Sequence, residues 1–246
     1  MANISVAMAT FNGEKFISEQ LDSILVQLGS EDEIIISDDN SKDSTVEIVK
    51  GYMKSDSRIK LFSNVNHGVI KNFENAIKLS QNEIVFLCDQ DDVWDHNKVA
   101  VIKKYFQNDN KLMVIVSDAY VTDDKLKIII DSFFELMNSH RGVVRNVLKN
   151  TYLGCTMAFR QSAKPYFLPI PKNVGMHDMW IGISMEMFGE TQFIPEKLVY
   201  YRRHDSTVTK MNKSKFSNIK SAILQRKDLT LELYKRHNSI KKRKMQ

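Results

Sequence analysis

Three carboxylates stand close together in the middle of this 246-residue chain, directly after an apolar run. Asp89, Asp91 and Asp92 follow the residues Ile-Val-Phe-Leu-Cys at 84–88. Side chains of an extended chain alternate between its two sides, so Asp89 and Asp91 point the same way. Two such carboxylates can bind a hard divalent cation such as Mg²⁺ or Mn²⁺, and a cation with open positions can hold a diphosphate. An Asp-rich turn that caps the following helix is the alternative on composition alone.

Apolar periodicity places this cluster within an alternating series of strands and helices. Short apolar runs predict strands at residues 4–9, 33–37, 58–62, 83–88 and 112–117. Apolar residues at helical spacing predict helices at residues 14–28, 43–54, 69–79 and 97–106. The alternation favours an α/β fold with a Rossmann-like, mostly parallel sheet and helices on both faces.

The ends of these strands are rich in polar residues. In open α/β sheets, ligands bind beyond the carboxyl ends of the strands. The segments that follow the first four predicted strands are residues 10–12, 38–40, 66–68 and 89–92, and three of the four are rich in Asp or Asn. This composition suits a pocket for a metal and a nucleotide, which favours the functional interpretation of the Asp cluster.

The second half of the chain is less regular. Residues 120–150 are expected to form a mobile loop with helical pieces. Strands are predicted at 153–159 and 193–202, and helices at 178–188 and 216–235.

Three segments, taken in order and spacing, resemble a known family. Residues 4–12, 35–45 and 88–94, the last of them including Asp-Gln-Asp-Asp-Val-Trp, resemble family 2 glycosyltransferases of the GT-A fold. The Asp-Gln-Asp-Asp-Val-Trp form resembles bacterial enzymes that build rhamnose-containing and related surface polysaccharides. The resemblance is clear over residues 3–118 and patchier to residue 210. It implies a GT-A domain over 1–212, with a nucleotide-sugar half at 1–118 and an acceptor half at 119–212. The many Lys and Arg residues after this domain predict a basic helical tail over 213–246.

The resemblance also assigns residues to the nucleotide. Thr10, Phe11 and Asn12 would border the base and ribose. Asp39 would accept a hydrogen bond from the imide N–H of uracil or thymine, which suits a group that only accepts. A turn cap is the alternative role for Asp39.

Four further residues would serve the diphosphate, the ribose and the cation. Lys71 is placed to reach the diphosphate, although a solvated surface lysine is the alternative. Asp89 would lie on the ribose side. Asp91 would bind Mn²⁺ or Mg²⁺, and His204 would complete the metal site.

A base must remove the proton from the acceptor hydroxyl. Met-His-Asp-Met-Trp at 176–180 resembles the base-bearing motif of the family, and we assign the base to Asp178. Burial beside a sugar and Trp180 is expected to raise the pKa of Asp178. His177 is the alternative base, and a helix cap is the alternative role for Asp178.

The function implied is metal-dependent, inverting transfer of a sugar from a UDP- or dTDP-linked donor to a hydroxyl of a glycan or lipid-linked acceptor in surface polysaccharide synthesis. The alternative is a non-catalytic subunit that binds nucleotide-sugars within an assembly complex. A glycoside hydrolase would leave Asp39 and the Asp cluster unexplained. Neither a Gly-x-Gly-x-x-Gly pattern nor a P-loop follows the first strand, which argues against an NAD enzyme and a P-loop kinase.

Charge and hydropathy give the expected location. The net charge is +5, yet residues 213–246 hold so many Lys and Arg that the rest is mildly acidic. No apolar run reaches the roughly 18 residues of a membrane span, and two cysteines fit a reducing compartment. We expect a cytoplasmic protein whose basic tail contacts the inner face of the membrane; a solvated tail is the alternative. Few aromatic residues accompany the basic tail, so nucleic acid is not expected as a partner.

Overall fold

The first half of the chain folds as the apolar pattern predicts. The computed structural model describes residues 2–204 and 219–243, and only the backbone of 219–225 and 243. The elements of the first half are β1 (Ile4–Thr10), α1 (Ile17–Leu25), β2 (Glu33–Asp38), α2 (Thr45–Ser55), β3 (Ile59–Ser63), α3 (Val69–Leu79), β4 (Ile84–Asp89), β5 (Val93–Trp94) and α4 (Lys98–Asn108). Only the two-residue strand β5 was not expected.

The second half differs more from the sequence-based prediction. Its elements are β6 (Leu112–Thr122), β7 (Ile128–Ile130), α5 (Phe133–Met137), α6 (Val143–Leu148), a 3-10 helix (Gly154–Thr156), β8 (Met157–Arg160), a 3-10 helix (Gln161–Ala163), α7 (Lys164–Phe167), α8 (His177–Phe188), β9 (Glu190–Arg202) and α9 (Ile219–Arg243).

Several predicted boundaries in this half are wrong, since β9, for instance, begins at Glu190 and not at residue 193. Two of the differences have a clear physical reason. Residues 120–122 form a strand rather than a loop because this end of β6 pairs with β9, from Asp118 opposite Lys197 to Thr122 opposite Arg202. The strand expected at 153–159 begins only at Met157. The preceding residues form a tight turn, because the N–H and hydroxyl of Thr156 both donate to the Leu153 carbonyl, at 3.1 and 2.8 Å. The helical pieces expected within 120–150 are confirmed as α5 and α6.

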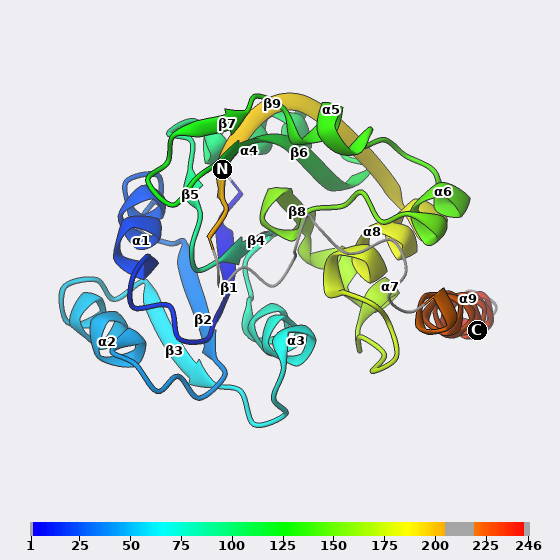
Figure 1. Ribbon diagram of the computed structural model, residues 1–246, viewed down its shortest axis with the longest axis horizontal. Helices are drawn as coiled ribbons and strands as arrows, with labels where there is room; N and C mark the ends of the chain where they lie inside the picture. Colours follow the sequence, from blue (N-terminus) through cyan, green and yellow to red (C-terminus); the bar gives the residue numbers. More distant parts are fainter. Residues whose placement is uncertain (1, 205–218, 244–246) are drawn as a thin grey trace.

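The strands form one nine-stranded sheet in the order β3-β2-β1-β4-β8-β6-β9-β5, with β7 paired to β6 (Figure 1). β1 pairs in parallel with β2 and β4, β2 with β3, and β6 with β9. β8 lies antiparallel between β4 and β6, and the pairings of β5 and β7 are antiparallel too. The sheet is therefore mostly parallel, as predicted, but mixed in its second half.

Apolar side chains of alternating strand residues form a core on each face of the sheet. Val6 and Met8 of β1 pack in one core together with α1 and α4, whereas Ala7 packs in the other core together with α3 and α8. This alternation is what an extended strand buried on both faces requires. The expected cover of helices on both faces is confirmed.

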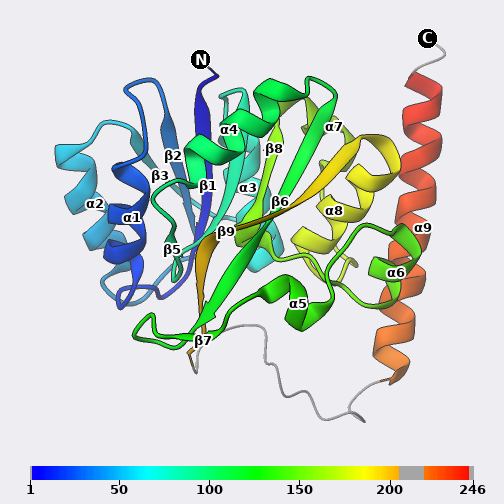
Figure 2. The same ribbon diagram turned by 90° about the horizontal axis from the view of Figure 1, so that it is seen from above.

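Helix α9 packs at the side of the molecule, against α6, α7 and α8 (Figure 2). Leu229 and Leu233 are buried there, and Arg236 donates to the carbonyls of Leu168 and Pro169, at 2.5 and 2.8 Å. The helix expected over 216–235 thus continues to Arg243, while residues 216–218 lie outside the described residues. None of the described helices combines the length and apolar character needed to cross a membrane.

The packing between α8 and the Tyr152 ring requires a glycine. A Cβ added at Gly182 would lie 2.4 Å from the Tyr152 ring. We expect Gly182→Ala to lower the free energy of unfolding by about 1–3 kcal/mol in urea titrations, because this contact cannot relax freely. Gly51→Ala is the control: a Cβ there meets nothing within 4 Å, so helix α2 should gain about 0.5–1 kcal/mol. An equal gain in both variants would contradict the packing argument.

Candidate functional site

A cavity of about 1010 Å³ lies beyond the carboxyl ends of β1, β2 and β4 and beside the first residues of α3. Most of the residues assigned to the site from the sequence line it, namely Thr10, Phe11, Asn12, Asp39, Asp89, Asp91 and His204. Parallel strands bring their carboxyl ends to one edge of a sheet, which explains how the first five of these residues meet. His204 arrives from the end of β9.

The two neighbouring carboxylates that follow β2 have different partners. Asp38 is buried and closes the turn, because it accepts from the N–H of Ser41 at 2.9 Å and from the Thr10 hydroxyl at 2.8 Å. Asp39 lines the cavity and is held by the Asn64 amide at 2.9 Å and the Gly68 N–H at 2.8 Å. Asp38 therefore caps the turn, and Asp39 remains oriented as an acceptor toward the cavity.

Asp91 and His204 meet on the cavity wall although 113 residues separate them. His204 Nε2 lies 2.8 Å from Asp91 Oδ2, and the His204 ring packs against the ring of Phe16 with centroids 4.7 Å apart. Arg202 strengthens this junction: its side chain donates to the Asp91 carbonyl at 2.8 Å, and its backbone N–H donates to Asp92 at 2.9 Å. A carboxylate oxygen and an imidazole nitrogen that converge in this way suit Mn²⁺, and the carboxylate also suits Mg²⁺.

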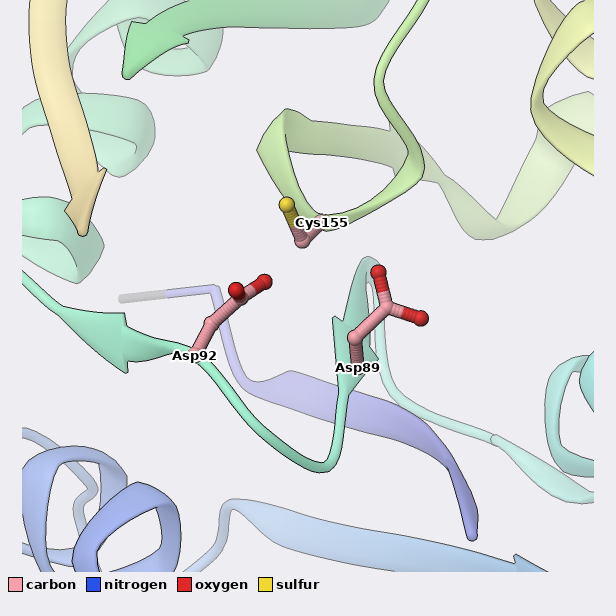
Figure 3. A group of neighbouring side chains, drawn as sticks. All are labelled: Asp89, Asp92 and Cys155. Atoms are coloured by element: carbon pink, nitrogen blue, oxygen red, sulfur yellow. The ribbon is translucent and has the colours of Figure 1, made fainter. Parts of the chain in front are cut away.

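A second group of potential ligands lies deeper. One ligand atom each from Asp89, Asp92 and Cys155 lies within 4.8 Å of the other two, and Figure 3 shows these three side chains gathered in one place. Burial raises the pKa of all three groups, and the neighbouring carboxylates add to this effect. A protonated thiol is a poor ligand. The buried Lys98 ammonium, 2.6 Å from the Cys155 carbonyl, already supplies positive charge here. Asp91 and His204 are therefore the better-suited ligands for a divalent cation.

The Lys71 side chain lies outside the lining of the cavity in which a diphosphate contact was predicted. Its ammonium pairs with Glu74 and donates to the Ile170 carbonyl at 2.9 Å, and Lys71 is not among the residues that line the cavity. The paired carboxylate of Glu74 and a carbonyl outside the cavity hold the side chain away. This geometry does not support the diphosphate role predicted for Lys71, and the predicted alternative of a solvated surface lysine does not hold either.

Asp178 lies at the start of α8, behind the cavity wall. Its side chain is 7% exposed, and it accepts from the N–H of Met179 at 2.5 Å and from Asn150 at 3.4 Å. Burial raises the pKa of Asp178 to about 6. Asp178 is near enough to raise the pKa of Asp89 electrostatically, yet it does not line the cavity itself. Met176 occupies the cap position of α8 without a side-chain hydrogen bond, whereas the Asp178 carboxylate accepts from the N–H of Met179 in the first turn, so Asp178 also fits the alternative role at the start of the helix.

His177 is an unusual neighbour of Asp178. Its ring stacks on Phe73, a cavity residue, with centroids 3.8 Å apart. Burial lowers the pKa of His177 to about 3, and neither ring nitrogen has a hydrogen-bond partner among the described residues. His177 is thus a much weaker proton acceptor than Asp178, which argues against the alternative base.

Several cavity residues were not singled out from the sequence. Gln90 forms two hydrogen bonds with the backbone of Phe11, at 2.8 and 2.9 Å, and so ties the ends of β1 and β4 together. Lys15, Asn72, Asp124 and Arg203 also line the cavity. The position of Gln90 between Asp89 and Asp91 and that of Arg203 beside His204 were available signals, whereas Lys15 and Asp124 meet only through tertiary contacts.

Comparisons with known proteins point in one direction. The family model "Glycosyl transferase family 2" matches residues 5–166. The uncharacterized protein Rv1520 of Mycobacterium tuberculosis is 28% identical over 208 residues, 82% of this chain and 59% of that protein. The dTDP-rhamnosyl transferase RfbG of Shigella flexneri is 40% identical over 111 residues, 42% of this chain and 38% of that protein. The chain thus spans less than two thirds of the length of these curated relatives.

Solved structures share the fold. The crystal structure of S. aureus TarS 1–349 in complex with UDP-GlcNAc matches 96% of this chain and 73% of that chain, with a TM-score of 0.66 and 18% sequence identity. At this identity the match concerns the fold, and it agrees with the sheet of mostly parallel strands described above.

Proposed function

The chain belongs to glycosyl transferase family 2, and on that premise we propose that it transfers a sugar from a UDP- or dTDP-linked donor to a hydroxyl of a glycan or lipid-linked acceptor. The proposed setting is bacterial surface polysaccharide synthesis, and the relative RfbG is named as a dTDP-rhamnosyl transferase. The reaction inverts the anomeric carbon in a single displacement. We further propose the division expected from the sequence, with a donor half over 1–118 and an acceptor half over 119–212.

One observation carries the proposal: Asp91 and His204 converge at 2.8 Å on the wall of a cavity that also presents Asp39. The oxygen and nitrogen donors fit a divalent cation such as Mn²⁺ or Mg²⁺. When bound there, such a cation supplies Lewis-acid stabilisation of the departing diphosphate. The reactions of a hydrolase or a dehydrogenase do not require a cation site at Asp91 and His204 together with a carboxylate, Asp39, that accepts a hydrogen bond from the imide of a base.

The side chains of the protein provide the remaining steps. Asp39 accepts a hydrogen bond from the base, and Thr10, Phe11 and Asn12 border the nucleoside. The Asp178 carboxylate takes the proton of the acceptor hydroxyl. The hydroxyl oxygen forms its bond to the anomeric carbon while the bond to the diphosphate breaks. Positioning of the two reactants contributes much of the catalysis.

The test is thermal stability in the presence of UDP, dTDP or GDP, each with and without Mn²⁺. A ligand that binds only the folded protein raises the midpoint by mass action. We expect UDP or dTDP to stabilise the protein, more so with Mn²⁺, and GDP to do so less, because guanine is a larger base than the pyrimidine proposed to bind at Asp39. Equal stabilisation by all three nucleotides, or by none, would contradict the proposal.

The spacing between Gly154 and α8 offers a separate test. A Cβ added at Gly154 would lie 2.8 Å from His177 Nε2 and 3.6 Å from Asp178 Cβ. The clash is with His177, so we expect Gly154→Ala to shift His177 together with the adjacent Asp178 and to lower the rate of sugar transfer about 10²-fold, since such misplacement is costly. UDP binding should remain, because Asp39 belongs to another wall. Transfer assays and nucleotide titrations measure the two effects, and an unchanged rate would contradict the assignment.

We also propose that α9 contacts anionic lipid at the inner face of the membrane, near a lipid-linked acceptor. Lys227, Lys241 and Lys242 are exposed on this helix. Replacing these three by Gln should weaken binding to anionic liposomes about 10²-fold, at about 1 kcal/mol per charge. Charge removal is cleaner than truncation, because truncation removes Leu229 and Leu233 from the core. The matched control replaces the exposed lysines 42, 50 and 54 of the opposite half, and an equal loss there would contradict the proposal.

A further inference from the structure

A half-buried arginine on the cavity wall has no acidic partner among the described residues. Arg203 follows β9, and its backbone N–H donates to the Thr122 carbonyl at 2.9 Å. Its guanidinium donates to the Tyr201 hydroxyl at 2.8 Å and lies 5.5 Å from the centroid of the Tyr201 ring. A guanidinium has five N–H donors, so most of this one is available to a ligand. By contrast, Arg58, Arg160 and Arg202 each pair with a carboxylate.

Lys15 is a second cation on the same wall. Its side chain is 65% exposed, and its ammonium lies 3.6 Å from Asp124 and 4.7 Å from the centroid of the Phe16 ring. An exposed ion pair at this distance contributes little stability. Lys15 can therefore exchange Asp124 for a more strongly charged anion without a large loss.

Both cations stand beside the Asp91–His204 pair. Lys15 precedes Phe16 and Arg203 precedes His204, and the rings of Phe16 and His204 pack with centroids 4.7 Å apart. Both cations are also anchored to the end of β6, Lys15 through Asp124 and Arg203 through Thr122. An anion that reaches Asp91 and His204 with their cation thus comes within reach of both positive side chains.

We propose that Arg203 and Lys15 bind the diphosphate of the donor, in place of Lys71. The inference deepens the proposed function and rests on it. The planar fork of Arg203 can bind two phosphate oxygens at once, while Lys15 contributes a mobile point charge. Tyr201 holds the fork in place. Together these cations offset negative charge that grows on the diphosphate as the sugar leaves.

The experiment compares the affinities of uridine, UMP and UDP by calorimetry, with thymidine, dTMP and dTDP in parallel, in EDTA so that no metal contributes. Wild type should bind UDP more tightly than uridine. Arg203→Gln should weaken UDP binding about 10- to 100-fold and leave uridine binding unchanged, because a hydrogen bond to a charged group is lost. Lys15→Gln should have a smaller effect in the same direction.

Three further variants sharpen the comparison. Lys125→Gln removes an exposed charge that follows Asp124 in the sequence and lies outside the cavity lining, so it controls for general electrostatics. Lys71→Gln should weaken UDP binding less than Arg203→Gln does. Tyr201→Phe removes the hydroxyl that holds the Arg203 guanidinium but keeps the guanidinium itself, so it should also weaken UDP binding. This variant provides an independent test if Arg203→Gln fails to fold.

The outcomes separate this inference from the proposed function. Wild type that binds none of the nucleotides, either in EDTA or with Mn²⁺ added, would overturn both. Wild type that binds UDP while Arg203→Gln keeps the full preference for UDP over uridine would overturn only the cation pair. A larger loss in Lys71→Gln than in Arg203→Gln would return the diphosphate to Lys71 and also overturn the inference.

Discussion

Asp178→Asn is expected to lower the turnover number of sugar transfer about 10²- to 10⁴-fold, the usual contribution of a positioned general base. The amide has nearly the same shape as the carboxylate but cannot take the proton of the acceptor hydroxyl. The nucleotide cavity does not include this side chain, so affinity for UDP or dTDP should be retained. Steady-state transfer assays and nucleotide titrations together measure the change.

The pH dependence of wild type gives a second readout for the same residue. Burial raises the pKa of Asp178 to about 6, and the base acts only when deprotonated. The turnover number should therefore be constant above pH 6 and fall as the pH decreases below it. Burial lowers the pKa of His177 to about 3, so a base at His177 would keep the activity down to much lower pH.

Control variants make the result specific. Glu190→Gln removes an exposed carboxylate just after α8 and should change neither rate nor pH profile. An Asp178→Asn enzyme with near wild-type turnover would place the base elsewhere. If the wild-type protein binds the nucleotide-sugar but transfers no sugar to any of the acceptors offered, the result would instead favour the non-catalytic subunit.

Chelation of divalent cations is expected to abolish most of the transfer activity of wild type, and added Mn²⁺ should restore it. Asp91→Asn should lower turnover in the presence of Mn²⁺ about 10²- to 10³-fold, a loss typical of removing one stabilising group from a transition state. His204→Gln should act in the same direction, because its Nε2 lies 2.8 Å from the Asp91 carboxylate.

A readout that does not depend on turnover separates metal binding from folding. The electron paramagnetic resonance signal of free Mn²⁺ decreases as the protein binds the ion. We expect this decrease with wild type and much less of it with Asp91→Asn. Glu47→Gln, an exposed carboxylate on α2, is the matched control and should behave as wild type. Retention of Mn²⁺ binding by Asp91→Asn and its loss in Asp92→Asn would move the metal to the deeper group with Asp89 and Cys155.

The fold of the first half was predictable because it rests on short-range patterns. β1, β2 and β4 are continuous apolar runs, and the helices between them repeat apolar residues at helical spacing. The second half was harder to predict because its strands depend on distant partners. β9 pairs with β6 over a long separation, and β8 inserts antiparallel between β4 and β6. No local pattern encodes such pairing.

By itself, the sequence determined the family, the mostly parallel sheet and the placement of Thr10, Asp39 and Asp89 at one edge, because strand ends follow directly from local hydrophobic order. The rest of the site depends on contacts between segments that are far apart in the chain. The tertiary structure joined His204 to Asp91 across 113 residues, buried Asp178 behind the wall and drew Lys71 away toward Glu74. Each of these depends on where a side chain finds its partner in space, and spacing along the chain does not specify that.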